Sequence, residues 1–178
     1  MRMQPAPTTQ ILHGIVEKTD DRALILPDGA TMEFLTSPDD DYDFCVMKGT
    51  IPAGGFVPLH SHPDTETFFV LSGTLEALTE TESGLGWKEV RPGDYLHVEG
   101  DARHAWRNAG EGAGIALVVT TRRLGGLFLE MGTPLTGAPE PPTADDLARL
   151  AALAAAYGHW LASPQENAAV GIELPALA

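Results

Sequence analysis

The sequence has few of the features that mark several classes of protein. Its single cysteine, Cys45, excludes an internal disulfide, and we expect it to be a small buried side chain in a strand. No stretch reaches the roughly 18 consecutive apolar residues of a membrane-spanning helix. Residues 1–7 lack the apolar run of a signal peptide. We therefore expect a cytoplasmic protein without a membrane partner.

Basic residues are also scarce. The chain has 11 Lys and Arg against 25 Asp and Glu, which gives a formal net charge of −14. Nucleic-acid binding needs clustered Lys and Arg to neutralise phosphates, so no nucleic-acid partner is expected. Apolar residues make up 43% of the 178 residues. A chain of this size and composition can bury one hydrophobic core without disulfides.

A cluster of candidate metal ligands lies between residues 54 and 73. His60 and His62 are two residues apart, so in a strand both imidazoles lie on one face, about 7 Å from each other. Glu66 has the same parity but would lie about 20 Å from His60 in a straight strand. The Pro-Asp pair at 63–64 has turn chemistry. The pattern predicts a strand ending in two imidazoles, a tight turn, and a second strand beginning with a carboxylate.

A second stretch adds another histidine. A hairpin turn is predicted at Gly93-Asp94, and His104 opens a later strand whose face it shares with Trp106 and Asn108. A lone histidine in a strand is usually a hydrogen-bonded structural residue. His60, His62, Glu66 and His104 together instead favour one divalent transition-metal ion, which is Fe, Mn, Ni, Co or Zn, with positions left for water or substrate.

These two stretches resemble the two sequence motifs of the cupin superfamily. The first motif is filled completely, by Gly54, His60, His62, Glu66 and Gly73. The second is matched at Gly93, His104 and Asn108, with Glu99 in place of the usual Pro and Asp101 in place of the usual Gly. Residues 125–132 are similar to the segment that follows the barrel in small quercetin-dioxygenase-like cupins.

The resemblance implies a fold and a role for the glutamate. It implies an all-β, antiparallel jelly-roll barrel with the metal inside. Many short strands separated by Gly and Asp turns independently predict an antiparallel sandwich or barrel. Glu66 is implied to be a metal ligand, a general base towards a substrate hydroxyl, or both. We expect residues 1–137 to form this domain and residues 138–178 to add a Pro-rich linker and a C-terminal α-helix capped by Thr143.

The substrate pocket and the oligomer are predicted from strand parity. Phe44, Phe68 and Trp106 are predicted to face inward with the ligands, as an apolar and aromatic pocket for a small-molecule substrate. Plain core packing is the alternative for each of them. The strand at 66–71 is apolar on both faces, which predicts a homodimer that covers the outer face.

Three functions are compatible with this site. The first is a metal-dependent dioxygenase or related oxidoreductase acting on a small aromatic, quercetin-like substrate. The second is a metal-dependent isomerase, lyase or polyketide-cyclase-like protein that uses the ion as a Lewis acid. The third is a non-catalytic small-molecule-binding barrel. The fold alone does not choose between them, because one fold hosts many activities. The identity of the metal and oxygen uptake with a flavonol or catechol separate the first two.

Overall fold

The computed structural model describes residues 23–40, 42–135 and 143–174. The strand predicted at 11–16 and the predicted Pro-rich linker at 138–142 lie outside these residues. None of the described helices is long and apolar enough to cross a membrane.

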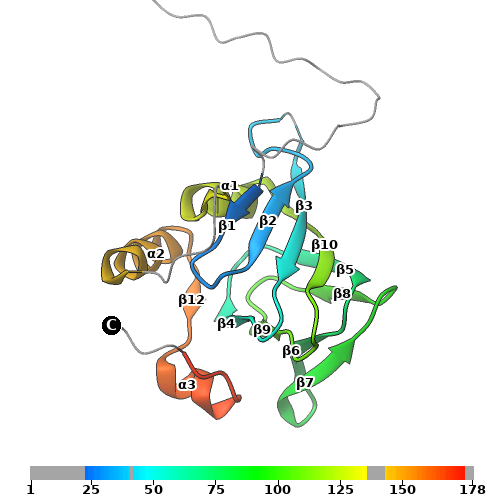
Figure 1. Ribbon diagram of the computed structural model, residues 1–178. Helices are drawn as coiled ribbons and strands as arrows, with labels where there is room; N and C mark the ends of the chain where they lie inside the picture. The colour runs from blue at the N-terminus through cyan, green and yellow to red at the C-terminus, as the bar shows by residue number, and fades with distance from the viewer. Residues whose placement is uncertain (1–22, 41, 136–142, 175–178) are drawn as a thin grey trace, which may run out of the picture.

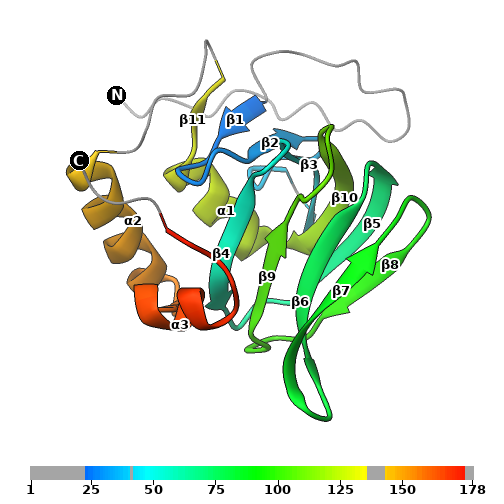
Figure 2. The ribbon, with the colours of Figure 1, turned by 60° about the horizontal axis from the view of Figure 1, so that its bottom comes forward.

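Strands are the commonest regular structure among the described residues, and they form two antiparallel sheets that face each other (Figures 1 and 2). The larger sheet has the order β11-β1-β2-β3-β10-β5-β8, and the smaller has β12-β4-β9-β6-β7. The strands of the larger sheet are β1 (Ala23–Ile25), β2 (Thr31–Phe34), β3 (Phe44–Ile51), β5 (Glu66–Ser72), β8 (Tyr95–Val98), β10 (Gly114–Thr121) and β11 (Thr133–Pro134). Those of the smaller are β4 (Phe56–Ser61), β6 (Leu75–Thr81), β7 (Gly84–Val90), β9 (His104–Arg107) and β12 (Trp160–Leu161).

The prediction of a closed barrel is wrong for the described part of the chain, because no strand pairing there joins one sheet to the other. The turn at Gly93-Asp94 is also not the predicted hairpin. Both this turn and the one at Ser72-Gly73 connect a strand of one sheet to a strand of the other. Gly73 has a positive φ, +77°, and a Cβ there would lie 2.6 Å from the Ala113 carbonyl oxygen. A glycine is needed where the chain crosses between the sheets.

The main core fills the space between the sheets. Cys45 and Met47 of β3 are fully buried in it, which confirms the expectation for the cysteine. The inward prediction for Phe44 is wrong, because this side chain is 45% exposed and stacks on Tyr42 outside the core. Alternation along β3 shows which side chains share a face. Because both faces are apolar, it does not show which face is buried.

A helix that was not predicted follows β10. Helix α1 (Arg122–Met131) begins at Thr121, whose side chain accepts a hydrogen bond from the Leu124 amide. The adjacent glycines at 125–126 have low helix propensity, so the sequence pattern did not predict a helix here. Packing requires Gly125, because a Cβ there would lie 2.8 Å from the Cys45 sulfur.

The C-terminal region contains two helices, not the single helix predicted. Helix α2 (Ala144–Ala156) begins at Thr143 as expected, with a capping box to Asp146. The two residues of β12 separate it from α3 (Pro164–Ala169), which begins at Ser163 with a second capping box, to Glu166. This Ser-Pro-Gln-Glu signature could have located α3 from the sequence.

The C-terminal segment packs on the outer face of the smaller sheet (Figure 2). Ile172 joins a second buried cluster with Leu59, Leu78 and Ala105. Asn167 has no exposed surface, and its Oδ1 accepts a hydrogen bond of 2.9 Å from the Leu59 amide in β4. The C-terminal segment is therefore attached to β4, the strand that carries His60 and ends just before His62.

Replacing Asn167 with Ala should destabilise the fold. The variant leaves the buried Leu59 amide without an acceptor, which costs about 1–3 kcal/mol in free energy of unfolding. Urea denaturation measures the loss. Gln165→Ala, at an exposed position of the same helix, is the control and should change stability by less than about 0.5 kcal/mol. Equal stability of the two variants would contradict a structural role for Asn167.

Candidate metal centre

Strand register brings two of the predicted ligands together. His60 of β4 lies directly opposite His104 of β9 in the antiparallel pairing. A register shift between Val57 and His60 marks an irregularity in the ladder just before the site. The two rings have centroids 4.2 Å apart. Residues 44 positions apart in the sequence thus become direct cross-strand neighbours.

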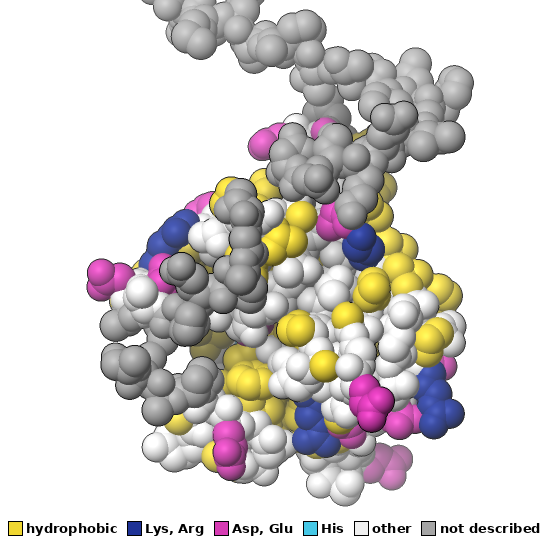
Figure 3. Space-filling model, in the orientation of Figure 1, with side chains coloured by type: hydrophobic (Ala, Val, Ile, Leu, Met, Phe, Trp, Pro, Cys, Tyr) yellow, Lys and Arg dark blue, Asp and Glu magenta, His cyan; other side chains and the backbone are white. Residues whose placement is uncertain are grey.

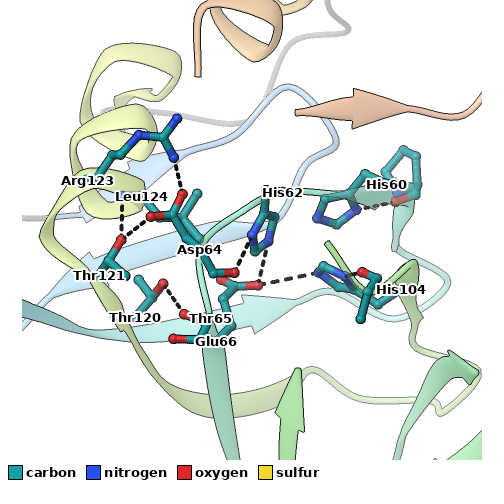
Figure 4. Close-up of polar contacts among 12 residues, drawn as sticks. His60, His62, Asp64, Thr65, Glu66, His104, Thr120, Thr121, Arg123 and Leu124 are labelled. Atoms are coloured by element: carbon teal, nitrogen blue, oxygen red, sulfur yellow. Dashed lines mark hydrogen bonds and ion pairs between the residues drawn. The ribbon is translucent and has the colours of Figure 1, made fainter. Parts of the chain in front are cut away.

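The predicted turn brings Glu66 to the same place. Strand β4 ends at Ser61, and the chain crosses to the other sheet, where Glu66 is the first residue of β5. Its Oε2 lies 3.2 Å from His62 Nε2 and 3.4 Å from His104 Nε2 (Figure 4). The His62 pair is a hydrogen bond, while the His104 pair lacks hydrogen-bond geometry.

The turn before His104 forms despite its two departures from the cupin motif. Asp101 adopts φ +65° where the motif has glycine. Aspartate tolerates this left-handed conformation better than most residues. The Asp101 amide donates a hydrogen bond of 2.6 Å to the His62 carbonyl, and the Ala102 amide donates one to Glu99. The second motif is thereby fastened to the first.

Backbone carbonyls fix the orientation of all three imidazoles. The Nδ1 atoms donate to the carbonyls of Pro58, Asp64 and Ala102, at 2.7, 2.8 and 2.9 Å for His60, His62 and His104 respectively. A carbonyl only accepts, so each Nδ1 carries a proton. The Nε2 atoms of His60 and His104 therefore keep their lone pairs in the neutral rings, whereas His62 Nε2 shares a proton with Glu66 that an ion would displace. One nitrogen from each ring lies within 4.8 Å of the others, and this convergence of three imidazoles fits a metal ion.

Burial and neighbouring charges shift the pKa values of His60, His62 and Glu66. Burial and the neighbouring His104 hold the pKa of His60 well below its ordinary value. For His62, burial lowers the pKa, but the hydrogen bond and charge of Glu66 outweigh burial and raise it. Burial would raise the pKa of Glu66, yet His104 and His62 hold it below its ordinary value. A proton shared by His62 and Glu66 thus occupies a position that a cation can take.

The Asp64 carboxylate binds other side chains and does not face the imidazoles. Asp64 accepts a hydrogen bond of 2.5 Å from the Thr121 hydroxyl and pairs with Arg123 of α1 (Figure 4). Its carboxylate is therefore turned away from the imidazoles, while its backbone carbonyl orients His62. Glu66 is the carboxylate that faces the three rings.

Two of the three predicted pocket residues face the interior with the ligands. Phe68 and Trp106 are 8% and 3% exposed, and their ring centroids are 4.6 Å apart. They lie two residues beyond Glu66 on β5 and two beyond His104 on β9, on the same strand faces. The Trp106 Nε1–H is buried without a hydrogen-bond partner. Phe44 does not take part, because its side chain lies on the outer face.

His159 was predicted to be a packing residue, and the structure places it beside the centre. Its ring centroid lies 4.9 Å from that of His62. Burial lowers its pKa to about 4. Neither cupin motif includes His159, because it lies about 55 residues after His104 and reaches the centre through a turn after α2.

Comparisons with known proteins agree with this geometry. The family model for the cupin domain matches residues 47–120, which include His60, His62, Glu66 and His104. No curated protein matches the chain. The cupin resemblance is thus confirmed for this segment, whereas the narrower likeness to quercetin dioxygenases stays a prediction.

Solved structures in the cupin superfamily are similar in fold. The polyketide cyclase RemF from Streptomyces resistomycificus is 22% identical, with a TM-score of 0.54 over 62% of this chain and 80% of that one. A predicted oxalate decarboxylase from Thermotoga maritima is 20% identical, with a TM-score of 0.47 over 52% and 79%. A sugar phosphate isomerase from Silicibacter pomeroyi is 20% identical, with a TM-score of 0.45 over 53% and 60%. At 22% identity, the likeness to RemF shows a similar fold and nothing beyond the fold.

Metal affinity should fall as the pH falls. An ion that binds His62 Nε2 displaces its proton, and the pKa of His62 is raised above its ordinary value of 6.5. The apparent Kd for Co²⁺ should therefore rise about tenfold per pH unit below that pKa. Calorimetry between pH 6 and 8 measures it.

Glu66→Gln is the matched control for this pH dependence. It removes the charge that raises the pKa of His62, so the loss of affinity should begin at a lower pH. A Kd that is constant from pH 6 to 8 would contradict proton displacement from His62.

Proposed function

We propose that the protein is a metal-dependent enzyme of the dioxygenase or related oxidoreductase type, acting on a small aromatic substrate that bears oxygen atoms. The observation that carries this proposal is the convergence of three oriented imidazoles beside one buried carboxylate. His60, His62 and His104 would hold one divalent transition-metal ion, with Glu66 as a further ligand. When bound, such an ion supplies Lewis-acid chemistry and, if redox-active, electron-transfer chemistry.

The residues around the ion site favour an aromatic substrate with an acceptor oxygen. Phe68 and Trp106 are buried beside each other, two residues beyond Glu66 and His104 respectively, and would form an apolar wall next to a bound substrate. An indole N–H can only donate, so the buried and unpartnered Nε1 of Trp106 needs an acceptor atom. A phenolic or carboxylate oxygen of the substrate would satisfy it.

Glu66 is the residue placed to accept a proton. Its carboxylate is 4% exposed, and burial favours the neutral form of a carboxyl group, so it can accept the proton of a substrate hydroxyl. The carbonyl contacts of His60, His62 and His104 keep the imidazoles in place while it does so. The same glutamate can act as a ligand before the substrate binds and as a base afterwards.

Elemental analysis of the purified protein tests the ligand assignment. About one equivalent of metal is expected, and His62→Ala should weaken binding by at least about 100-fold, since even an outer partner of a ligand is worth 10–100-fold. Circular dichroism should show the fold retained. His97→Ala, at an exposed position of β8, is the control and should keep its metal. Full metal content in His62→Ala would refute the site.

The identity of the metal and oxygen uptake separate the two enzyme classes. Iron, manganese, nickel or cobalt, together with oxygen uptake in the presence of a flavonol or catechol, would support the oxidoreductase proposal. Zinc that the other ions do not displace, with no oxygen uptake, would instead support isomerase, lyase or cyclase chemistry through a Lewis acid.

We also propose that a second copy of the chain covers the outer face of the larger sheet. Hydrophobic side chains gather there, on the side where Figure 1 places β10, β5 and β8 (Figure 3). Phe69 lies opposite both Leu117 and Tyr95, and Tyr95 is 65% exposed. The outward residues of β3, β10, β5 and β8 include no Asp or Glu, although the net charge is −14. Like-charge repulsion therefore does not oppose self-association at this face.

Replacing Phe69 with Glu should dissociate this dimer. An unpaired charge buried in an apolar interface is costly, so the dimer Kd should rise at least about tenfold. Light scattering after size-exclusion chromatography measures the mass. Leu129→Glu, at an exposed apolar position of α1, should leave the dimer intact. A monomeric wild type, or an equal effect of the two variants, would contradict this interface.

A further inference from the structure

The segment 157–161, here called the strap, runs along β4, the strand that carries His60 and ends just before His62. Gly158, with φ +73°, turns the chain after α2. The two residues of β12 then pair antiparallel with β4, where Leu161 lies opposite His60 and Trp160 opposite Ser61. The strap therefore extends the smaller sheet at its β4 edge, beside His60 (Figure 1).

His159 is the strap residue nearest to the centre. Its ring lies over that of His62, with centroids 4.9 Å apart and planes inclined by 36°. Its backbone amide donates a hydrogen bond of 2.8 Å to the Ala154 carbonyl, which fixes the main chain at this point. The carboxylates of Glu66 and Asp64 and the guanidinium of Arg123 are the charged groups around it.

One arginine fixes the strap against the loop that carries the ligands. Arg123 pairs with the Asp64 carboxylate and also donates to the Tyr157 carbonyl, at the start of the strap. The Tyr157 hydroxyl donates to Glu130 at 2.6 Å, which attaches the strap to α1 as well. Asp64 in turn orients His62 through its own carbonyl. The position of His159 relative to His62 is thus held from both sides.

Packing alone does not explain a histidine at this position. Its Nε2 is buried and has no hydrogen-bond partner, a costly arrangement that a phenylalanine would avoid. Among the described residues, the other buried side-chain nitrogens and oxygens without a partner are His104 Nε2 and Trp106 Nε1. Both belong to the candidate site. His159 shares with His104 and Trp106 a buried side-chain nitrogen without a partner, and we therefore group it with the candidate site.

His159 is not one of the converging metal ligands. The nitrogens that lie within 4.8 Å of one another come from His60, His62 and His104. The strap histidine contacts His62 from outside this group. Its Nε2 has no hydrogen-bond partner among the described residues.

We propose that His159 is a substrate-binding residue, whose Nε2 forms a hydrogen bond with an oxygen atom of a phenolate, enolate or carboxylate substrate held at the metal centre. This inference rests on the proposed metal-dependent function. It gives the C-terminal strap a direct part in substrate recognition, as the wall of the site that the two cupin motifs do not supply.

Binding of 4-nitrocatechol to the Co²⁺-loaded protein tests this inference. The probe carries two phenolic oxygens, and its visible spectrum reports binding without turnover. His159→Phe keeps an aromatic ring over His62 but removes the hydrogen bond, so the Kd for the probe should rise about tenfold or more at unchanged cobalt stoichiometry. His159→Gln should recover part of the loss. His97→Phe, on the exposed strand β8, should bind the probe like the wild type.

The probe Kd and the cobalt content together test the role of His159. An unchanged Kd in His159→Phe would overturn the role of His159 and leave the metal centre intact. Loss of cobalt from His159→Phe would also overturn it, because His159 would then support the ion and not the substrate. A wild type that binds no cobalt would refute the proposed metal centre itself, and the inference with it. If His159→Phe does not fold, the Kd of His159→Gln relative to the wild type decides.

Discussion

The structure depends on the pairing of β4 with β9, which sets His60 opposite His104. This register brings the two motifs together, and the amide of Asp101 then fastens the second motif to the carbonyl of His62. Three backbone carbonyls complete the arrangement, because each accepts a hydrogen bond from Nδ1 of one imidazole and so fixes its orientation. The donor set is thus oriented mainly by main-chain groups, and a ligand that binds there meets rings that need little reorganisation.

Local sequence rules found the ligands because the site is encoded by short-range spacing. The parity of His60 and His62, the turn at 63–64 and the start of a strand at Glu66 are each features of a few adjacent residues. The capping residue Thr143 was found in the same way. Burial of Phe44 could not be read like this, because β3 is apolar on both faces and only the neighbouring strands decide which face is inward.

Long-range packing determined what the sequence did not reveal. The two sheets do not close into a barrel in the described part of the chain, and the turn expected to form a hairpin crosses between them. Helix α1 depends on the close approach of Gly125 to Cys45, a contact that propensity alone disfavours. His159 reaches the site only because β12 pairs with β4. Each of these features is a tertiary contact between segments remote in sequence, for which the local pattern carries no signal.

The pairing of β12 with β4 also has a consequence for the order in which the centre is assembled. During synthesis the ribosome releases the three imidazoles and Glu66 well before the strap, because residues 60–104 precede residues 157–161 in the chain. The nascent centre therefore has an unfinished wall, and this edge of the smaller sheet stays unpaired until the last part of the chain emerges.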